Sequence, residues 1–105
     1  MVKWCKNPYL DEKLTLKWKK IRKKMEKEKL LLGYYCIVLP SNPENLLDII
    51  CCNELLFPYY KRKTIYAVGM SKSRDGAVLL VKEMVEDMYD DTGRICPKEY
   101  FIFPK

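Results

Sequence analysis

Residues 63–92 read KTIYAVGMSKSRDGAVLLVKEMVEDMYDDT, and this stretch decides the fold. A segment rich in strand-forming residues, 64–70, leads through the polar turn 71–76 into a helical pattern over 75–91. The helix is predicted because its apolar residues recur at intervals of three and four and form a broad face, namely Ala77, Leu80, Val81, Met84, Val85 and Met88. Gly93 supplies the helix stop. A strand followed by a core helix predicts an α+β domain.

Toward the N-terminus, segment 34–39 (YYCIVL) is a second predicted strand. Segment 43–56 admits two interpretations. Its opening residues, with Pro43 and Glu44 in the first turn, favour a helix, whereas the short apolar run 46–51 also suits a strand. We expect the helix, because the start signal is explicit.

Two further strands complete the prediction, an edge strand over 57–60 and a closing strand over 100–103. Residues 34–105 then form a core domain with the order β-α-β-β-α-β, the ferredoxin-like split βαβ arrangement. In such a two-layer fold, one face of the sheet stays open. Alternation places apolar side chains on both faces, so the open face needs a cover.

Residues 1–33 are predicted to be an addition to this core. Residues 1–9 show no period and are expected to be an irregular stretch, either an ordered tail or a frayed lead-in, and a basic amphipathic helix is expected from Asp11 to about residue 31. The helix carries a narrow apolar stripe at helical spacing, formed by Leu14, Trp18, Ile21 and Met25. Two covers for the open sheet face are therefore possible. One is this stripe, and the other is a second copy of the chain.

The charge of the 105-residue chain is unevenly distributed. The net charge is +6, yet 11 of the 20 lysines and arginines fall within residues 1–33. Acids gather instead on the polar face of the 75–91 helix, at Glu83, Glu86, Asp87, Asp90 and Asp91. Because a helix dipole disfavours anions at the C-terminal end, we expect a basic neighbour there. The N-terminal helix is the predicted partner, in the same chain or in a dimer.

Several classes of chemistry find no support in the sequence. There is no histidine, and the five cysteines show no CxxC pair, so neither a zinc site nor another metal or cofactor is expected. Adjacent Cys51 and Cys52 are interpreted as one core and one half-exposed residue rather than a redox or soft-metal pair. No catalytic constellation is present, and we expect a non-enzymatic protein. No secretory signal or membrane span is evident, which predicts a cytoplasmic location.

One candidate site is the turn before the 75–91 helix. Free backbone N–H groups at a helix N-terminus favour anions, and Ser71, Lys72, Ser73 and Arg74 add donors and charge. These residues predict a site for a small anion or metabolite. The simpler interpretation is that Ser73 or Asp75 only caps the helix.

The other candidate is a basic surface that would contact a nucleic acid or an acidic partner. Its predicted residues come from two segments and are Lys17, Lys20, Arg22, Lys24, Lys27, Lys61, Arg62 and Lys63. The leading hypothesis for function is a protein-binding or self-associating module, expected to be a homo-oligomer such as a dimer. The alternatives are an RNA- or DNA-binding protein and a small-anion or metabolite-binding regulatory domain.

Overall fold

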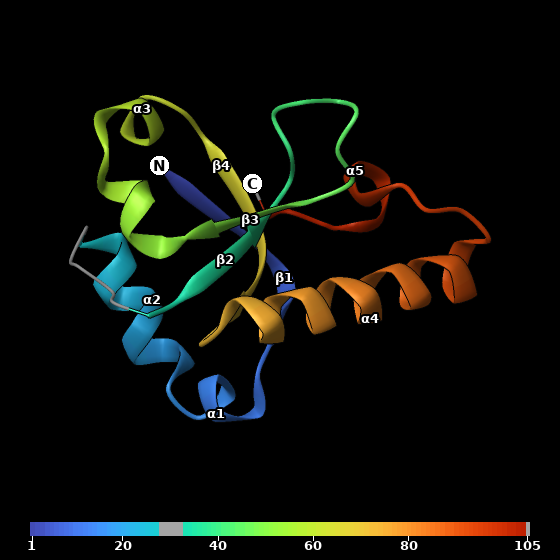
Figure 1. Ribbon diagram of the computed structural model, residues 1–105, viewed down its shortest axis with the longest axis horizontal. Helices are drawn as coiled ribbons and strands as arrows, with labels where there is room; N and C mark the ends of the chain where they lie inside the picture. The colour runs from blue at the N-terminus through green and yellow to red at the C-terminus, as the bar shows by residue number, and fades with distance from the viewer. Residues whose placement is uncertain (28–32, 105) are drawn as a thin grey trace.

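The computed structural model describes residues 1–27 and 33–104, which form a mixed α+β fold around a four-stranded sheet (Figure 1). The strands are β1 (Val2–Leu10), β2 (Tyr35–Val38), β3 (Asp48–Cys51) and β4 (Ile65–Ser71). The helical segments are α1 (Glu12–Thr15), α2 (Trp18–Glu26), the 3-10 helix η1 (Cys52–Leu56), α3 (Pro58–Lys61), α4 (Arg74–Thr92) and α5 (Pro97–Tyr100). The strand order is β1-β4-β2-β3, with β1 parallel to β4 and β2 antiparallel to both of its neighbours.

The stretch that decides the fold behaves as predicted. Strand β4 leads into α4, the longest helix, whose buried face carries Leu80, Met84 and Met88. The hydroxyl of Ser73 accepts a hydrogen bond from the Gly76 N–H at 2.9 Å and caps the helix. Gly93 ends it in the left-handed region, with φ of 71°.

Both faces of the sheet are apolar, and the chain itself covers both. Cys36 and Val38 of β2 belong to one buried cluster, and Ile37 between them belongs to the other. Helix α4 covers the face of Ile37. The opposite face is covered by the predicted stripe, in which Leu14 and Ile21 are buried and Trp18 and Met25 pack beside them. The first of the two expected covers is therefore confirmed.

Strand β4 departs from simple alternation at its centre. Its register with β2 shifts by one residue between Ile37, opposite Gly69, and Val38, opposite Ala67. Val68 and Gly69 consequently both face α4, and Met70 joins Ala67 in the other cluster. Glycine is required at 69, because a Cβ there would lie 2.8 Å from the Tyr9 carbonyl oxygen and 2.8 Å from Met84 Cε.

The prediction of an irregular tail over residues 1–9 is wrong. These residues form most of β1, which pairs with β4 at the edge of the sheet. A local period is missing because the register shifts between Trp4 and Tyr9, where Asn7 adopts φ of 53°. The proposed division at residue 33 stays a prediction, although β1 belongs to the same sheet as the strands of 34–105.

The expected helix over 43–56 is also wrong, and the strand alternative is confirmed by β3. Ile49 and Ile50 pair with Ile37 and Cys36 of β2. The start signal belongs to a turn that is not continued, in which the Asn42 side chain accepts a hydrogen bond from the Glu44 N–H at 3.0 Å.

Neither of the last two predicted strands forms. Segment 57–60 is mostly α3, because Pro58 occupies the first helical turn, where its missing N–H costs nothing. At 100–103, Tyr100 closes α5, and the chain then runs extended beside β1 with a backbone bond from Lys6 N–H to the Ile102 carbonyl of 2.8 Å. The ferredoxin-like order is not confirmed, since the strand order is β1-β4-β2-β3.

The predicted helix from Asp11 to residue 31 is interrupted rather than continuous. A hydrogen bond of 3.0 Å from the Lys17 N–H to the Leu14 carbonyl, three residues earlier as in a 3-10 turn, ends α1, and α2 begins at Trp18. Residues 28–32 lie outside the described part, so the predicted end of the helix falls there. Within the described ranges, 1–27 and 33–104, no helix is long and apolar enough to cross a membrane.

Candidate nucleic-acid interface

Helix α2 sits on the sheet with its apolar stripe and points its charges outward. The Trp18 ring packs edge-on against Trp4 of β1, with ring centroids 4.5 Å apart. All of the basic residues predicted for this segment are exposed, namely Lys17, Lys20, Arg22, Lys24 and Lys27. Arg22 has an i,i+4 ion pair with Glu26, at 3.4 Å between Nε and Oε1. The helix therefore presents a cationic outer face held by a buried inner one.

The second basic segment follows from α3 and is also exposed, at Lys61, Arg62 and Lys63. The Lys63 ammonium lies 2.6 Å from the Tyr59 hydroxyl and 4.1 Å from the centre of the same ring. Tyr59 and Phe57 are each 57% exposed. Aromatic rings therefore stand among the cations on this side of the molecule.

A cavity of about 410 Å³ lies between the end of α2 and the segment η1–α3. One side of it is formed by the end of α2, with Met25 and Glu26, and the other by η1 and α3, with Leu56, Tyr60 and Lys61. Its remaining wall includes Met1, Val2, Trp4, Cys52 and Leu55. We call it the α2–α3 cavity. Its volume is within the usual range for ligand pockets, and apolar side chains predominate.

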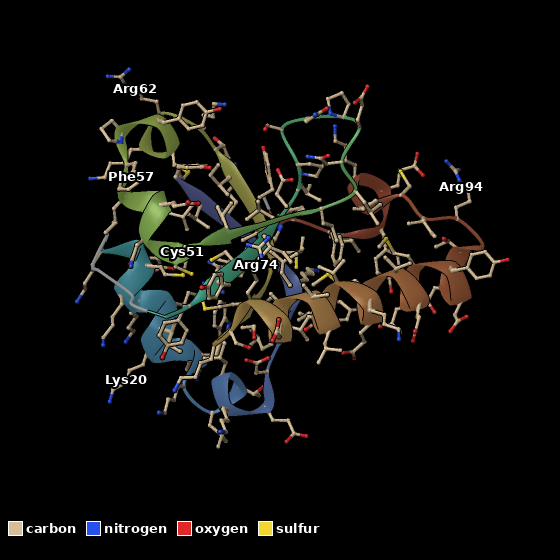
Figure 2. All side chains as sticks on the ribbon, viewed as in Figure 1. Lys20, Cys51, Phe57, Arg62, Arg74 and Arg94 are labelled. Atoms are coloured by element: carbon tan, nitrogen blue, oxygen red, sulfur yellow. The ribbon has the colours of Figure 1, made fainter. Side chains whose placement is uncertain are left out.

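Figure 1 shows α2 and α3 at one end of the molecule, with the N-terminus between them. In Figure 2, Lys20 and Arg62 project outward from that end, whereas Arg94 lies at the opposite end, beyond α4. The eight residues predicted from sequence as a basic surface thus come from residues 17–27, on and around α2, and from residues 61–63, at and after the end of α3, and of these Lys61 lines the cavity. We keep the name basic surface for this set.

A second cavity, of about 370 Å³, lies beside the start of β4. Lys63 and Lys98 line it together with Tyr66 and Phe103, whose rings are in edge-on contact at 5.1 Å. Lys61 lines the α2–α3 cavity and Lys63 lines this second cavity, and each cavity has aromatic side chains in its wall. This arrangement extends the cationic, aromatic surface beyond α3.

The predicted anion site at the start of α4 already contains an anion from the chain itself. The Asp11 carboxylate accepts hydrogen bonds from the Ser71 hydroxyl at 2.8 Å and from the Lys72 N–H at 2.9 Å. Ser73 is engaged in capping α4, and Arg74 is exposed. The four residues are adjacent as expected, but two of their donors are used by Asp11. Binding of an external anion there stays a prediction.

The acidic face of α4 meets tyrosines rather than lysines. Tyr9 donates to the Asp87 carboxylate at 2.5 Å, and Tyr100 donates to Asp91 at 2.7 Å. Burial, and then the bond to Asp87, raise the pKa of Tyr9 far above its usual value. For Tyr100, the hydrogen bond to Asp91 is the main cause of a raised pKa. These hydroxyls explain how α4 tolerates acids toward its C-terminal end.

In residues 1–27 and 33–104, the basic helix does not dock near these acids. Helices α2 and α4 pack on opposite faces of the sheet. Asp87 and Asp91 accept hydrogen bonds from tyrosine hydroxyls of β1 and α5. Docking between two chains stays a prediction.

The cysteines have the expected split in burial, and no metal site is apparent in the described ranges. Cys52 is buried and Cys51 is half-buried. In residues 1–27 and 33–104, no group of three or more cysteine, aspartate or glutamate side chains could hold a metal ion. Burial raises the pKa of Cys5 to about 11, so this thiol is protonated at neutral pH.

Sequence reasoning missed most of the α2–α3 cavity. Trp4 and Met1 lie in a segment without periodicity. Cys52 and Leu55 are predicted to belong to one long helix over 43–56, whereas they lie in the short 3-10 helix η1. The signal that could have found Trp4 is the presence of a large apolar residue close to a cluster of lysines.

Comparisons with protein-family models, with curated proteins and with solved structures found no match for this chain.

Proposed function

We propose that this protein binds single-stranded nucleic acid with the basic surface at the α2–α3 end. The observation that carries the proposal is that two helices with exposed cations, α2 and α3, are far apart in sequence and both contribute to the wall of one largely apolar cavity. A phosphate backbone that crosses from α2 to α3 would contact lysines on both sides. Each phosphate neutralised releases counterions and contributes to affinity.

The aromatic side chains favour a single strand over a duplex. Single-strand binders combine a positive groove with rings on which bases stack. Phe57 and Tyr59 are exposed beside Arg62 and Lys63, and Tyr66 is 38% exposed at the second cavity. Bases in a duplex are already stacked and paired, so these rings would offer them little.

Acids are also present on this side. Glu26 is paired with Arg22, and burial, followed by the nearby charge of Glu54, raises the pKa of Tyr60. The acidic face of α4 lies on the other side of the sheet. The exposed cations of the basic surface would attract a polyanion over roughly a Debye length of 8 to 10 Å.

Fluorescence anisotropy with a labelled oligouridine, a labelled oligothymidine and a labelled duplex tests the proposal. The variant Lys20→Glu/Lys24→Glu should weaken single-strand binding roughly tenfold or more at low salt. Lys82→Glu/Arg94→Glu changes net charge equally but lies on and after α4, and it should bind nearly as well as the unchanged protein. Equal losses in both variants would show that net charge alone is responsible. Tighter binding to the duplex would contradict the preference for single strands.

A second candidate is self-association, which the opposite placement of charge favours. The basic surface of one copy and the acidic face of α4 in another are complementary, whereas they cannot meet within one chain. Light scattering at low and high salt tests this candidate. We expect a dimer that dissociates as salt rises and that Asp90→Lys weakens. A monomer at every salt concentration contradicts it.

A further inference from the structure

We propose that Cys36 and Cys52 are a site of reversible oxidation that forms an intramolecular disulfide. The two sulfur atoms lie 2.9 Å apart, and both residues are buried. A disulfide bond is about 2.05 Å long, so a sulfur movement of roughly 1 Å joins them. Cys36 lies on β2, and Cys52 begins η1 directly after β3.

The register of the sheet holds the two thiols in this position. Cys36 is opposite Ile50 in the antiparallel pair of β2 and β3, and Cys52 lies two residues further along. A backbone bond of 2.9 Å from the Cys52 N–H to the Tyr34 carbonyl continues the pairing beyond β3. Both side chains belong to the cluster beneath α2. Diagonal neighbours on one face are close enough for side chains to meet.

The α2–α3 cavity gives a small oxidant a route to the pair, because Cys52 is part of its wall. With a peroxide, the Cys52 thiol loses its proton as its sulfur attacks one oxygen, the O–O bond breaks, and the leaving hydroxide takes up that proton, so that a sulfenic acid and one water form. The Cys36 sulfur then attacks the Cys52 sulfur, releases a second water and forms the S–S bond. Two thiols lose two electrons and two protons, and the peroxide is reduced to two waters.

The remaining cysteines are placed elsewhere. Cys5 belongs to the cluster beneath α4, where its thiol lies 3.9 Å from the Val68 carbonyl oxygen. Cys51 is the last residue of β3, where it pairs with Tyr35 and is half-buried. Cys96 lies just before α5. The hydrogen bond with Cys52, together with burial, raises the pKa of Cys36 and keeps it a thiol until its partner reacts.

Peptide mapping of the full chain after treatment with hydrogen peroxide tests the site. The protein is then denatured and alkylated without reduction. Cleavage after Glu44 separates Cys36 from Cys51 and Cys52. We expect the two peptides to be linked, with a mass lower by two hydrogen atoms, and to separate on treatment with dithiothreitol.

Cys51→Ser is the matched control, because it removes the neighbouring thiol and should leave the link intact. Cys52→Ser should abolish the link. The proposal is overturned if Cys36 and Cys52 are both fully alkylated after oxidation of the unchanged protein. It is equally overturned if the link persists in Cys52→Ser and disappears in Cys51→Ser. The mapping of the unchanged protein decides the question even if a variant fails to fold.

Discussion

Asp11 determines what the turn between β4 and α4 can do. Its carboxylate binds the hydroxyl of Ser71, which is fully buried, and the N–H of Lys72. It therefore satisfies a buried polar group and joins the start of the N-terminal helices to the start of α4. A side chain that a sequence pattern assigns to a helix cap is used for a contact 60 residues away.

Asp11→Ala should lower the free energy of unfolding by about 1–3 kcal/mol, because it leaves the Ser71 hydroxyl buried without its acceptor. Urea denaturation measures the change. Glu12→Ala is the control, since Glu12 is an exposed neighbouring acid and should change stability by less than about 0.5 kcal/mol. We also expect inorganic phosphate to stabilise Asp11→Ala more than the unchanged protein, as the vacated donors match an anion. Equal stability of the two variants would contradict this role of Asp11.

The bond between Tyr9 and Asp87 makes stability depend on pH in the alkaline range. Since burial and the bond to Asp87 raise the pKa of Tyr9 above its ordinary value of 10.0, the folded state binds the proton more tightly than the unfolded chain does. Stability from this bond is complete below about pH 9 and falls as pH rises above 10. Tyr9→Phe should cost about 1–3 kcal/mol at neutral pH, with a difference from the unchanged protein that shrinks above pH 10. Tyr89→Phe, which removes an exposed hydroxyl, is the control, and a constant difference for Tyr9→Phe would contradict the assignment.

Elements with strong local signals were predictable, and those that depend on distant partners were not. The helix α4 has a wide apolar face, a cap at Ser73 and a stop at Gly93, all of which can be seen in its own residues. Strand β1 has no such pattern, because its pairing with β4 is interrupted by a bulge at Asn7. For the same reason, both basic segments of the candidate site were predictable, but the cavity between them was not. Its walls depend on where β1 and η1 lie.

Helices α1 and α2 pack on the sheet through Leu14 and Ile21, and we expect this packing to contribute to the stability of the fold. Leu14→Ala and Ile21→Ala should each lower the free energy of unfolding by about 2–5 kcal/mol, because both side chains are buried against the sheet. Lys20→Ala, an exposed position on the same helix, should change it by less than about 0.5 kcal/mol. Chemical denaturation compares them. Losses below about 1 kcal/mol at both apolar positions would show that α1 and α2 do not cover the sheet.

At the scale of the whole molecule, the two layers of helices carry opposite charges on opposite faces of one sheet. An open sheet face was one reason to expect self-association, and α1 and α2 remove that reason by covering the face. The cationic side remains, with its cavity and exposed rings at the α2–α3 end. Exposed cations there, such as Lys20, Lys24 and Arg62, are accessible to a polyanion.

The most direct test is the affinity of the unchanged protein for a labelled single strand, measured over a range of salt concentrations. Contacts of the basic surface with about three to five phosphates predict a linear fall of log K against log salt, with a slope between about −2 and −4. Lys20→Glu/Lys24→Glu should make that slope shallower by about one to two. No binding at the lowest salt concentration, or an affinity that does not change with salt, would contradict the proposed nucleic-acid interface.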